Sequence, residues 1–291
     1  MTGPQDAGRQ DAGPQDAPRG EPTQAAGSPH TFPVAGPMTL TVGLEFGALR
    51  VHAEDTDTVT ARVWPAHPGR RSDVETAERA RIHATDNAVE IRIPGGARRM
   101  LFGKPGSVDI EVVVPTGSTL RIDAGYAEVE VSGTVEACTV RSSYGDLRVD
   151  RTGRLDVDSQ GGTITANRIG GPATVSTTYG RIRIREVAGP TELATSSGDI
   201  AVDRATADVS ARSAYGQVEV GELVRGSATL SASYGSVTVG IPTGTAAYLD
   251  ARSDHGKVRS ELDRTTEPRA DVERATVRAR TSYGEITIRR S

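Results

Sequence analysis

Residues 179–202 read YGRIRIREVAGPTELATSSGDIAV, and this stretch contains the pattern that decides the fold. It begins with Tyr179-Gly180, and aliphatic residues follow at alternate positions. One interval later Ser197-Gly198 begins the same pattern again. Alternation with a period of two indicates a half-buried β-strand. A unit that returns at a fixed distance indicates stacked copies of one supersecondary structure.

The unit recurs through the C-terminal half of the chain. We call the position of Tyr179 the aromatic slot; it falls at residues 126, 144, 161, 179, 197, 215, 234, 255 and 283. The interval is nearly constant, about 18 residues, as far as Tyr234, and the last two intervals are longer. Gly161, Ser197 and His255 replace the aromatic tyrosine in three copies. The predicted structural markers of the repeat are Tyr126, Tyr144, Gly145, Tyr179, Gly180, Gly198, Tyr215, Gly216, Tyr234, Gly235, Gly256, Tyr283 and Gly284.

A second strand completes each unit. Gly171-Pro172 and Gly189-Pro190 precede short apolar stretches and are typical of corners. Two strands and two corners in about 18 residues form one coil of a solenoid. The sequence therefore predicts an all-β fold, a parallel β-solenoid of about nine coils over residues 120–291, roughly 40 Å long at about 4.8 Å per coil. The longer last intervals predict loops through 263–271 and an atypical final turn that caps the stack.

The N-terminal part of the chain lacks this repeat. Residues 1–30 are of low complexity and predict a disordered tail, because they have too few apolar groups to offset their ordering entropy. Residues 31–119 alternate in places without a fixed period and predict an irregular β-rich region that caps the solenoid.

Three local structures are expected within that region. Residues 82–93 predict a hairpin about Asp86-Asn87, and residues 108–114 predict a strand that ends at Pro115. Residues 72–84 have weak apolar positions, so we expect a loop that leads into a strand rather than a helix.

The Tyr-Gly pair has a structural and a functional interpretation. Stacking the coils would align the tyrosine rings in a ladder, in which each pair adds about 0.5–1.5 kcal/mol beyond burial. The glycine suits a corner with positive φ or a close approach between coils. The same ladder could instead serve as an aromatic platform for a sugar or another ligand. The structural interpretation is favoured, because the ladder is interrupted at three positions.

Composition limits the possible partners. The formal net charge is −4, so no overall field attracts nucleic acid or an anionic membrane. Cys138 is the only cysteine and is expected to be a small buried hydrophobe. No export signal and no apolar run of about 18 residues is visible, which predicts a cytoplasmic protein without a membrane span. Surface association would follow if the true start lies upstream.

The repeat resembles a family of bacterial β-strand-repeat proteins of unknown function that are labelled putative adhesins. The resemblance rests on Gly-Asp-Ile and Tyr-Gly-x-aliphatic units such as 197–200 and 144–147, and on the lead-in 112–120. It covers residues 34–291 and implies a β-repeat fold without established catalytic residues. Members are often exported or tethered to a membrane.

No reactive constellation is found, so we predict no catalytic residue, no metal site and no cofactor. The five histidines lack the spacing of a helical metal site. Gly103-Lys104 is not a phosphate loop, because Arg98 stands where its first glycine is needed. Arg98, Arg99 and Lys104 are expected to form a solvated loop.

The leading hypothesis is a non-enzymatic scaffold or adhesin-like protein, which presents its solenoid surface to a protein or glycan partner. One alternative is a self-assembling cytoskeletal element similar to the bactofilins, with self-association as its partner interaction. Another is a solenoid carbohydrate-active enzyme, which would require Asp146, Asp156 and Asp199 to converge on one groove.

Overall fold

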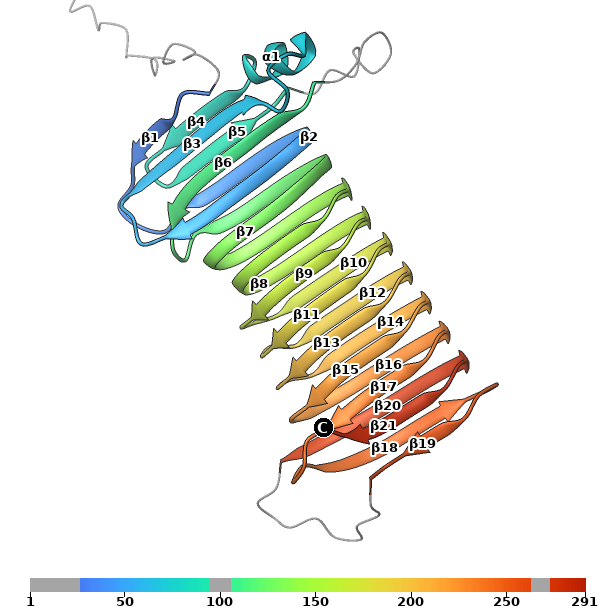
Figure 1. The fold of residues 1–291 in the computed structure, drawn as a ribbon. Coiled ribbons are helices and arrows are strands. Elements are labelled where there is room, and N and C mark those ends of the chain that lie inside the picture. The colour runs from blue at the N-terminus through green and yellow to red at the C-terminus, as the bar shows by residue number, and fades with distance from the viewer. Residues whose placement is uncertain (1–26, 95–105, 263–272) are drawn as a thin grey trace, which may run out of the picture.

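The computed structural model of the protein describes residues 27–94, 106–262 and 273–291. Over these described residues the fold is a β-solenoid with one short helix at its N-terminal end (Figure 1). Successive coils pair through parallel strands, so the predicted all-β fold and parallel solenoid are confirmed. The predicted tail over residues 1–30 and the loop over 263–271 lie almost entirely outside the described residues.

The N-terminal strands and the helix have the following bounds: β1 His30–Pro33, β2 Thr39–Glu54, β3 Thr58–Pro65, α1 Arg71–Ala77, β4 Arg81–Thr85, β5 Ala88–Arg92 and β6 Val108–Pro115. The hairpin is confirmed, because β4 and β5 pair antiparallel with Thr85 opposite Ala88. The strand ending at Pro115 is also confirmed. Of the loop leading into a strand that was expected over 72–84, the loop is wrong at its start, because α1 forms there and buried Asp73, Thr76 and Ala77 anchor its inner face; the strand is present as β4.

The remaining strands follow in sequence: β7 Thr119–Tyr144, β8 Leu147–Gly161, β9 Ile164–Ile169, β10 Ala173–Tyr179, β11 Ile182–Val187, β12 Thr191–Ser197, β13 Ile200–Ala205, β14 Val209–Tyr215, β15 Val218–Leu223, β16 Gly226–Tyr234, β17 Val237–Ile241, β18 Ala246–Ser253, β19 Val258–Ser260, β20 Arg274–Tyr283 and β21 Ile286–Arg290. The strand segments that lead up to the aromatic slot form one face, which we call the entry face. The segments that follow it form the second, which we call the exit face; the long strands β2, β7 and β8 continue around a corner and contribute to both.

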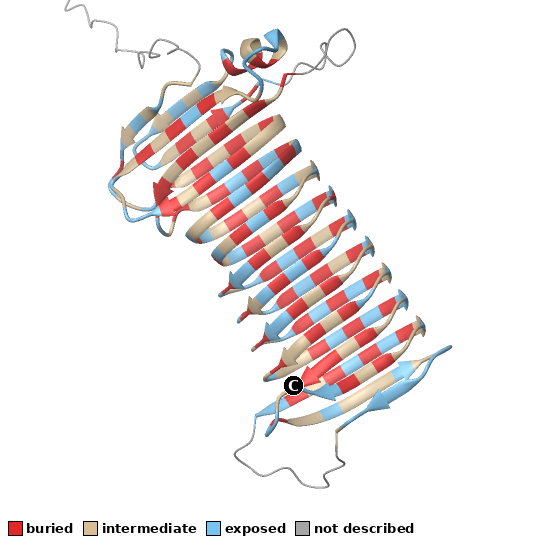
Figure 2. Ribbon diagram, in the orientation of Figure 1, coloured by how far each residue is buried: buried red, intermediate tan, exposed pale blue. Residues whose placement is uncertain are grey.

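Each coil sends a fixed set of side chains inward. In the coil from β10 to β11 the buried side chains are those of Ala173, Val175, Thr177, Ile182, Ile184 and Val187. The same positions are buried in the neighbouring coils, which gives alternating bands of buried and outward residues along every strand (Figure 2). The interior is therefore a thin aliphatic core repeated along the stack.

The parallel stack begins before residue 120. Strand β2 pairs with β7 over its whole length, with Phe46 opposite Tyr126. On its other side β2 pairs in parallel with β5 and β6, and the antiparallel strands β3 and β4 then follow. The strands within residues 30–92 and 108–115 thus contribute both coils and an antiparallel end to the solenoid.

The last two coils do not stack in sequence order. Strand β20 lies between β16 and β18, and β21 lies between β17 and β19. The prediction that the C-terminal turn caps the stack is therefore wrong. The coil of β20 and β21 is inserted, and the earlier coil of β18 and β19 is outermost. The inserted coil has the stronger core, because Val277, Ile286 and Ile288 are buried whereas Val258 is 45% exposed.

Candidate functional site

The corner at the aromatic slot is closed by backbone contact between coils. Gly216 has a φ of +153°, and a Cβ placed there would lie 2.0 Å from the carbonyl oxygen of Gly198 in the preceding coil. A Cβ on Gly235 would likewise lie 2.0 Å from the oxygen of Gly216. Both predicted reasons for glycine therefore act together at Gly216, where positive φ and close approach exclude larger side chains.

A buried hydroxyl two residues before the slot supports the same corner. The Ser213 hydroxyl donates to the carbonyl oxygen of Gly198 at 2.9 Å, and that of Thr281 donates to the oxygen of Gly235 at 2.9 Å. These bonds cross from one coil to the next. They give a physical reason for the hydroxyl residue before Tyr215 and before Tyr283, whereas the hydroxyls of Ser142 and Thr177 at the same position have no hydrogen-bond partner among the described residues.

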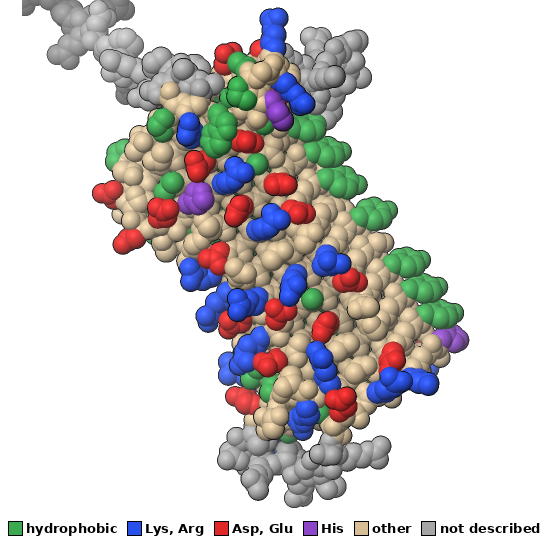
Figure 3. Space-filling view, in the orientation of Figure 1, with side chains coloured by type: hydrophobic (Ala, Val, Ile, Leu, Met, Phe, Trp, Pro, Cys, Tyr) green, Lys and Arg blue, Asp and Glu red, His purple; other side chains and the backbone are tan. Residues whose placement is uncertain are grey.

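The aromatic side chains form a ladder along one edge of the solenoid, where Figure 3 shows a column of hydrophobic side chains. Neighbouring rings are stacked with centroids 4.6 to 5.5 Å apart. Because the last coil is inserted, Tyr283 lies between Tyr234 and His255. In spatial order the slot is held by Phe46, Tyr126, Tyr144, Gly161, Tyr179, Ser197, Tyr215, Tyr234, Tyr283 and His255.

Phe46 is the rung that sequence reasoning missed. Its ring stacks on Tyr126 with centroids 5.4 Å apart. The signal was present, because Phe46-Gly47 is followed by Leu49 and Val51 in the same alternation as the later copies. The long stretch of chain between this copy and Tyr126 hid it from a search for a fixed period.

The ladder rings face solvent rather than the core. The exposed fraction of the six slot tyrosines ranges from 40% at Tyr144 to 61% at Tyr179 and Tyr215, whereas Phe46 is half-buried. Tyr179 has no stacked ring among the described residues, since Gly161 and Ser197 hold the rungs beside it. The tyrosines therefore form an accessible aromatic surface in addition to any contribution that they make to stability.

The three carboxylates that a solenoid hydrolase would need do not converge. Asp146 accepts a hydrogen bond from the backbone N–H of Thr163 at 2.9 Å, and Asp199 accepts one from Gln217 at 3.0 Å. Both lie at the aromatic corner, but three coils apart, about 14 Å. Asp156 lies on the entry face, on strand β8. The Gly-Asp units thus hold neighbouring coils together by capping backbone N–H groups.

The other groups considered in the sequence analysis are Cys138, possible metal ligands and the cluster of basic residues. Cys138 is fully buried, as expected, and burial raises the pKa of its thiol to about 12. Among the described residues no three His, Cys, Asp or Glu side chains come together as metal ligands. Arg98, Arg99 and Lys104 lie outside the described part of the chain. No helix in that part is long and apolar enough to cross a membrane.

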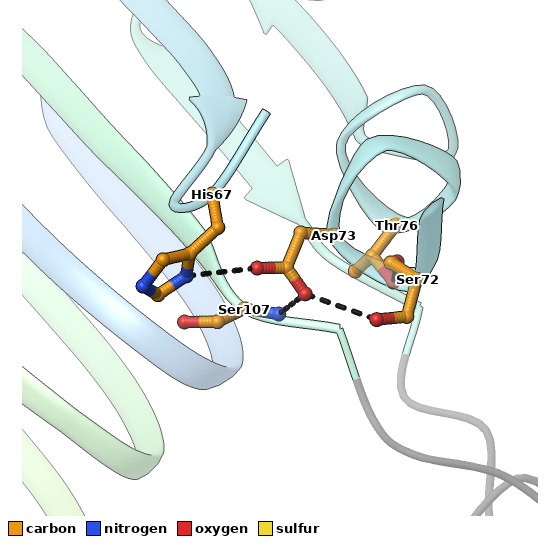
Figure 4. Close-up of polar contacts among 5 residues, drawn as sticks. All are labelled: His67, Ser72, Asp73, Thr76 and Ser107. Carbon is orange, nitrogen blue, oxygen red and sulfur yellow. Dashed lines mark hydrogen bonds and ion pairs between the residues drawn. The ribbon is translucent and has the colours of Figure 1, made fainter. Parts of the chain in front are cut away.

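A buried carboxylate ties α1 to the start of β6 (Figure 4). Asp73 is 1% exposed and accepts hydrogen bonds from Nδ1 of His67 at 3.1 Å, the backbone N–H of Ser107 at 3.2 Å and the Ser72 hydroxyl at 3.1 Å. Burial favours a higher pKa for Asp73, but these hydrogen bonds outweigh it and leave the pKa below its usual value. Because Ser72 donates to the carboxylate and not to His67, the cluster does not activate a serine nucleophile.

A hollow of about 790 Å³ lies on the entry face beside β4 and β5. Its charged lining is balanced, with Arg81, Arg92 and Arg141 alongside Glu45, Asp123 and Asp158. Arg92 is already paired with Glu90 at 2.5 Å. The hollow therefore has no net charge that would select one class of ligand.

Parallel register, the repeated corner and the two-faced coil define the chain as a β-solenoid protein. Within that class it belongs to the Toastrack DUF4097 family, whose sequence pattern matches residues 44–289. The resemblance inferred from the repeat is thereby confirmed. No curated protein matches the chain significantly.

Several solved structures match the chain at low sequence identity. A putative adhesin from Bacteroides fragilis is 10% identical, with 92% of this chain and 99% of that chain covered and a TM-score of 0.40. A putative adhesin from Parabacteroides merdae is 10% identical, with 91% and 96% covered and a TM-score of 0.44. A putative lipid binding protein from Parabacteroides distasonis is 10% identical, with 89% and 96% covered and a TM-score of 0.34.

Proposed function

We propose that this protein is a non-enzymatic binding protein that contacts a protein or glycan partner through its aromatic edge. The observation that carries the proposal is the exposure of the ladder. Six tyrosines in the slot keep 40% to 61% of their surface accessible while standing in one column. Aromatic residues are enriched at recognition surfaces, where they supply a large contact area at low entropic cost.

Because the interior of the solenoid is filled by packed side chains, we look for the functional site on the surface. The inward positions of the coils are filled by aliphatic and small hydroxyl side chains, and the described core is one continuous cluster. The surface charges pair across neighbouring coils, as in Arg204 with Glu222 at 2.6 Å and Arg168 with Glu186 at 3.7 Å. The aromatic edge is distinct from this balanced surface and is the best candidate for a contact that releases water from apolar groups.

The test removes rings without disturbing the corner. A triple variant Tyr215→Ser, Tyr234→Ser and Tyr283→Ser copies a substitution that Ser197 already makes in the same slot. A control triple variant, Thr174→Ala, Ser210→Ala and Thr229→Ala, alters exposed positions on the entry face. Both are compared with the natural sequence on a glycan array and by affinity purification from the native host.

We expect the ring variant to lose the partners that the natural chain and the control retain. Circular dichroism melting checks that all three proteins are folded. A ring variant that keeps every partner of the natural chain would show that the ladder has only a structural role.

The carbohydrate-active enzyme is not favoured, because Asp146, Asp156 and Asp199 are dispersed and two of them hold backbone N–H groups. One observation supports self-association: the outer coil is half-buried, and its Val258 is exposed. Its outer side pairs with no described strand, whereas the other end carries antiparallel strands and α1. Those ends favour a tail-to-tail dimer over a filament.

Sedimentation velocity tests this second candidate. The natural chain should sediment as a dimer at high concentration, and Val258→Lys should shift it toward the monomer. A natural chain that stays monomeric would remove the candidate.

A further inference from the structure

One coil on the exit face carries small outward side chains between two rows of large ones. On β9, Thr165 lies opposite Arg148 of β8 on one side and opposite Arg183 of β11 on the other. At the edge of the same coil, Gly161 lies between Tyr144 and Tyr179. Thr165 is half-buried, whereas Arg148 and Arg183 are exposed. The two arginine backbones are about 10 Å apart, so their long side chains can meet over the threonine.

The charges of these rows do not cancel. Strand β11 begins after Arg181 and carries Arg183 and Arg185, so three guanidinium groups alternate along its outward side. Arg181 is paired with Asp199 at 3.4 Å. Among the described residues, neither Arg183 nor Arg185 has a carboxylate within ion-pair distance.

The acidic residues on the opposite row are already engaged. Asp146 lies 3.4 Å from Arg148 and also accepts the Thr163 N–H. Asp150 lies 3.4 Å from Arg151 and accepts a hydrogen bond from Asn167 at 3.0 Å. The positions beside Arg183 are the neutral residues Thr165 and Ala201. Asp203 lies beside Arg185 on the next coil, in the register that pairs Ile184 with Val202 and Glu186 with Arg204, so the surplus positive charge centres on Arg183.

We propose that the surface over Thr165 binds an acidic oligosaccharide. A carboxylate or sulfate group lies between the guanidinium groups of Arg148 and Arg183, with the Thr165 hydroxyl beneath it. A neighbouring sugar ring packs its C–H face against Tyr179, whose ring is 61% exposed and unstacked among the described residues. This deepens the proposed function and rests on it, because it names the class of glycan at one part of the aromatic edge.

Two other anionic partners fit the surface less well. An acidic peptide would usually add a strand to a sheet edge, but β11 already pairs with β9 and β13. A nucleic acid needs a broad basic surface, whereas this row is a few residues wide in a chain of net charge −4. A short saccharide with spaced acidic groups matches a single row and an adjacent ring.

The test uses isothermal titration calorimetry on the full chain with three probes: tetragalacturonic acid, neutral maltotetraose and inorganic phosphate. The main variants are Arg183→Gln alone and Arg148→Gln with Arg183→Gln. The control is Arg121→Gln with Arg212→Gln, which makes the same charge change at exposed positions on the entry face. Thr165→Gln fills the low row without adding charge, and Tyr179→Ser removes the ring.

The natural chain should bind the acidic tetrasaccharide and not the neutral one, with affinity that falls as salt rises. The double variant should lose about tenfold or more in affinity, since charged hydrogen bonds are lost. Thr165→Gln should also weaken binding, and the control should stay within about twofold. Tyr179→Ser should weaken saccharide binding more than phosphate binding.

Three results would overturn the inference: no binding of tetragalacturonic acid by the natural chain, equal binding of maltotetraose, or equal loss in the control variant. Binding of phosphate as strong as that of the saccharide would reduce the site to a general anion site and also overturn it. The proposed function has its own test: it fails if the triple ladder variant at residues 215, 234 and 283 keeps its partners. A chain that captures partners through the ladder but ignores acidic sugars contradicts this inference alone.

Discussion

The coil of β18 and β19 and the coil of β20 and β21 are copies of the same repeat with different positions in the stack. The first follows its predecessor in sequence, yet it lies outermost. The second comes last in the chain, yet it lies between two coils. Val258 and Ile286 are opposite each other in register, and they are 45% and 0% exposed.

The comparison shows that burial follows a coil's position in the stack and not its position in the sequence. An inserted coil must be apolar toward both neighbours, whereas an outer coil needs to match only one. The chain places the coil with Val277, Ala279, Ile286 and Ile288 in the inserted position. The segment between the two coils is long enough in sequence to allow this return, because the interval between slots is longest from His255 to Tyr283.

The largest expected effect is the difference in the free energy of unfolding between substitutions at the paired positions Ile286 and Val258. Ile286→Ala should lower the free energy of unfolding by about 2–5 kcal/mol, since it opens a cavity between two packed coils. Val258→Ala should change it by about 0.5 kcal/mol or less, because Val258 is half exposed. Denaturant unfolding of both variants measures the difference. Equal losses would contradict the inserted arrangement.

A smaller effect is expected at the tyrosines of the same two coils. Tyr283 stacks on Tyr234 at 5.0 Å and on His255 at 4.6 Å, whereas Tyr248 is 68% exposed with no stacked ring among the described residues. Tyr283→Ser should cost about 1–3 kcal/mol, from two stacked pairs. Tyr248→Ser should cost about 0.5 kcal/mol or less. Thermal unfolding tests this, and a Tyr248 variant as destabilised as the Tyr283 variant would argue against the ladder.

The smallest effect concerns one of the ion pairs that join the two coils, Arg280 with Asp250. Arg280 donates to the Asp250 carboxylate at 2.6 Å, and this bond holds the pKa of Asp250 below its usual value. Because the pKa of Asp250 is lower in the folded state, the ion pair stabilises the fold at pH values above the unfolded pKa, which is about 3.9. This stabilisation is lost as the pH falls through the folded pKa. The outer coil should therefore lose protection from hydrogen exchange in acid.

Protection factors of the β18 amides, corrected for the intrinsic pH dependence of exchange, measure this loss. Asp250→Asn should show little further change with pH, and the β20 amides should stay protected in both proteins. Loss of protection in β20 at the same pH would mean that the two coils open as one unit.

Much of the fold could be predicted because it depends on the short-range alternation of apolar and polar residues. The fixed period of the repeat, the inward aliphatic positions and the need for glycine at Gly216 all follow from the local pattern. The helix α1 escaped prediction, because its stability comes from the contacts of buried Asp73 rather than from an apolar stripe. The Phe46 rung escaped because a long insertion separates it from the next copy.

The candidate site was less predictable than the fold. The sequence predicted that the tyrosines stand in one column. It did not predict that their rings point toward solvent, because that direction depends on which side of the corner faces outward in the stacked coils. The surface over Thr165 depends on register, since Arg148 and Arg183 are distant in sequence and meet only through the intervening coil. Each of these residues stands four positions after its slot, so the repeat already aligns them in one column; only the stacked structure shows which of their charges remain unpaired.

By itself the sequence determined a β-solenoid with a Tyr-Gly corner, because alternation and a fixed period each depend on residues close together in the chain. Only the tertiary structure decided which coil ends the stack, which rings are accessible and which charges remain unpaired. Those properties depend on the neighbours of each coil across the stack, and the inserted final coil shows that these neighbours need not be adjacent in sequence.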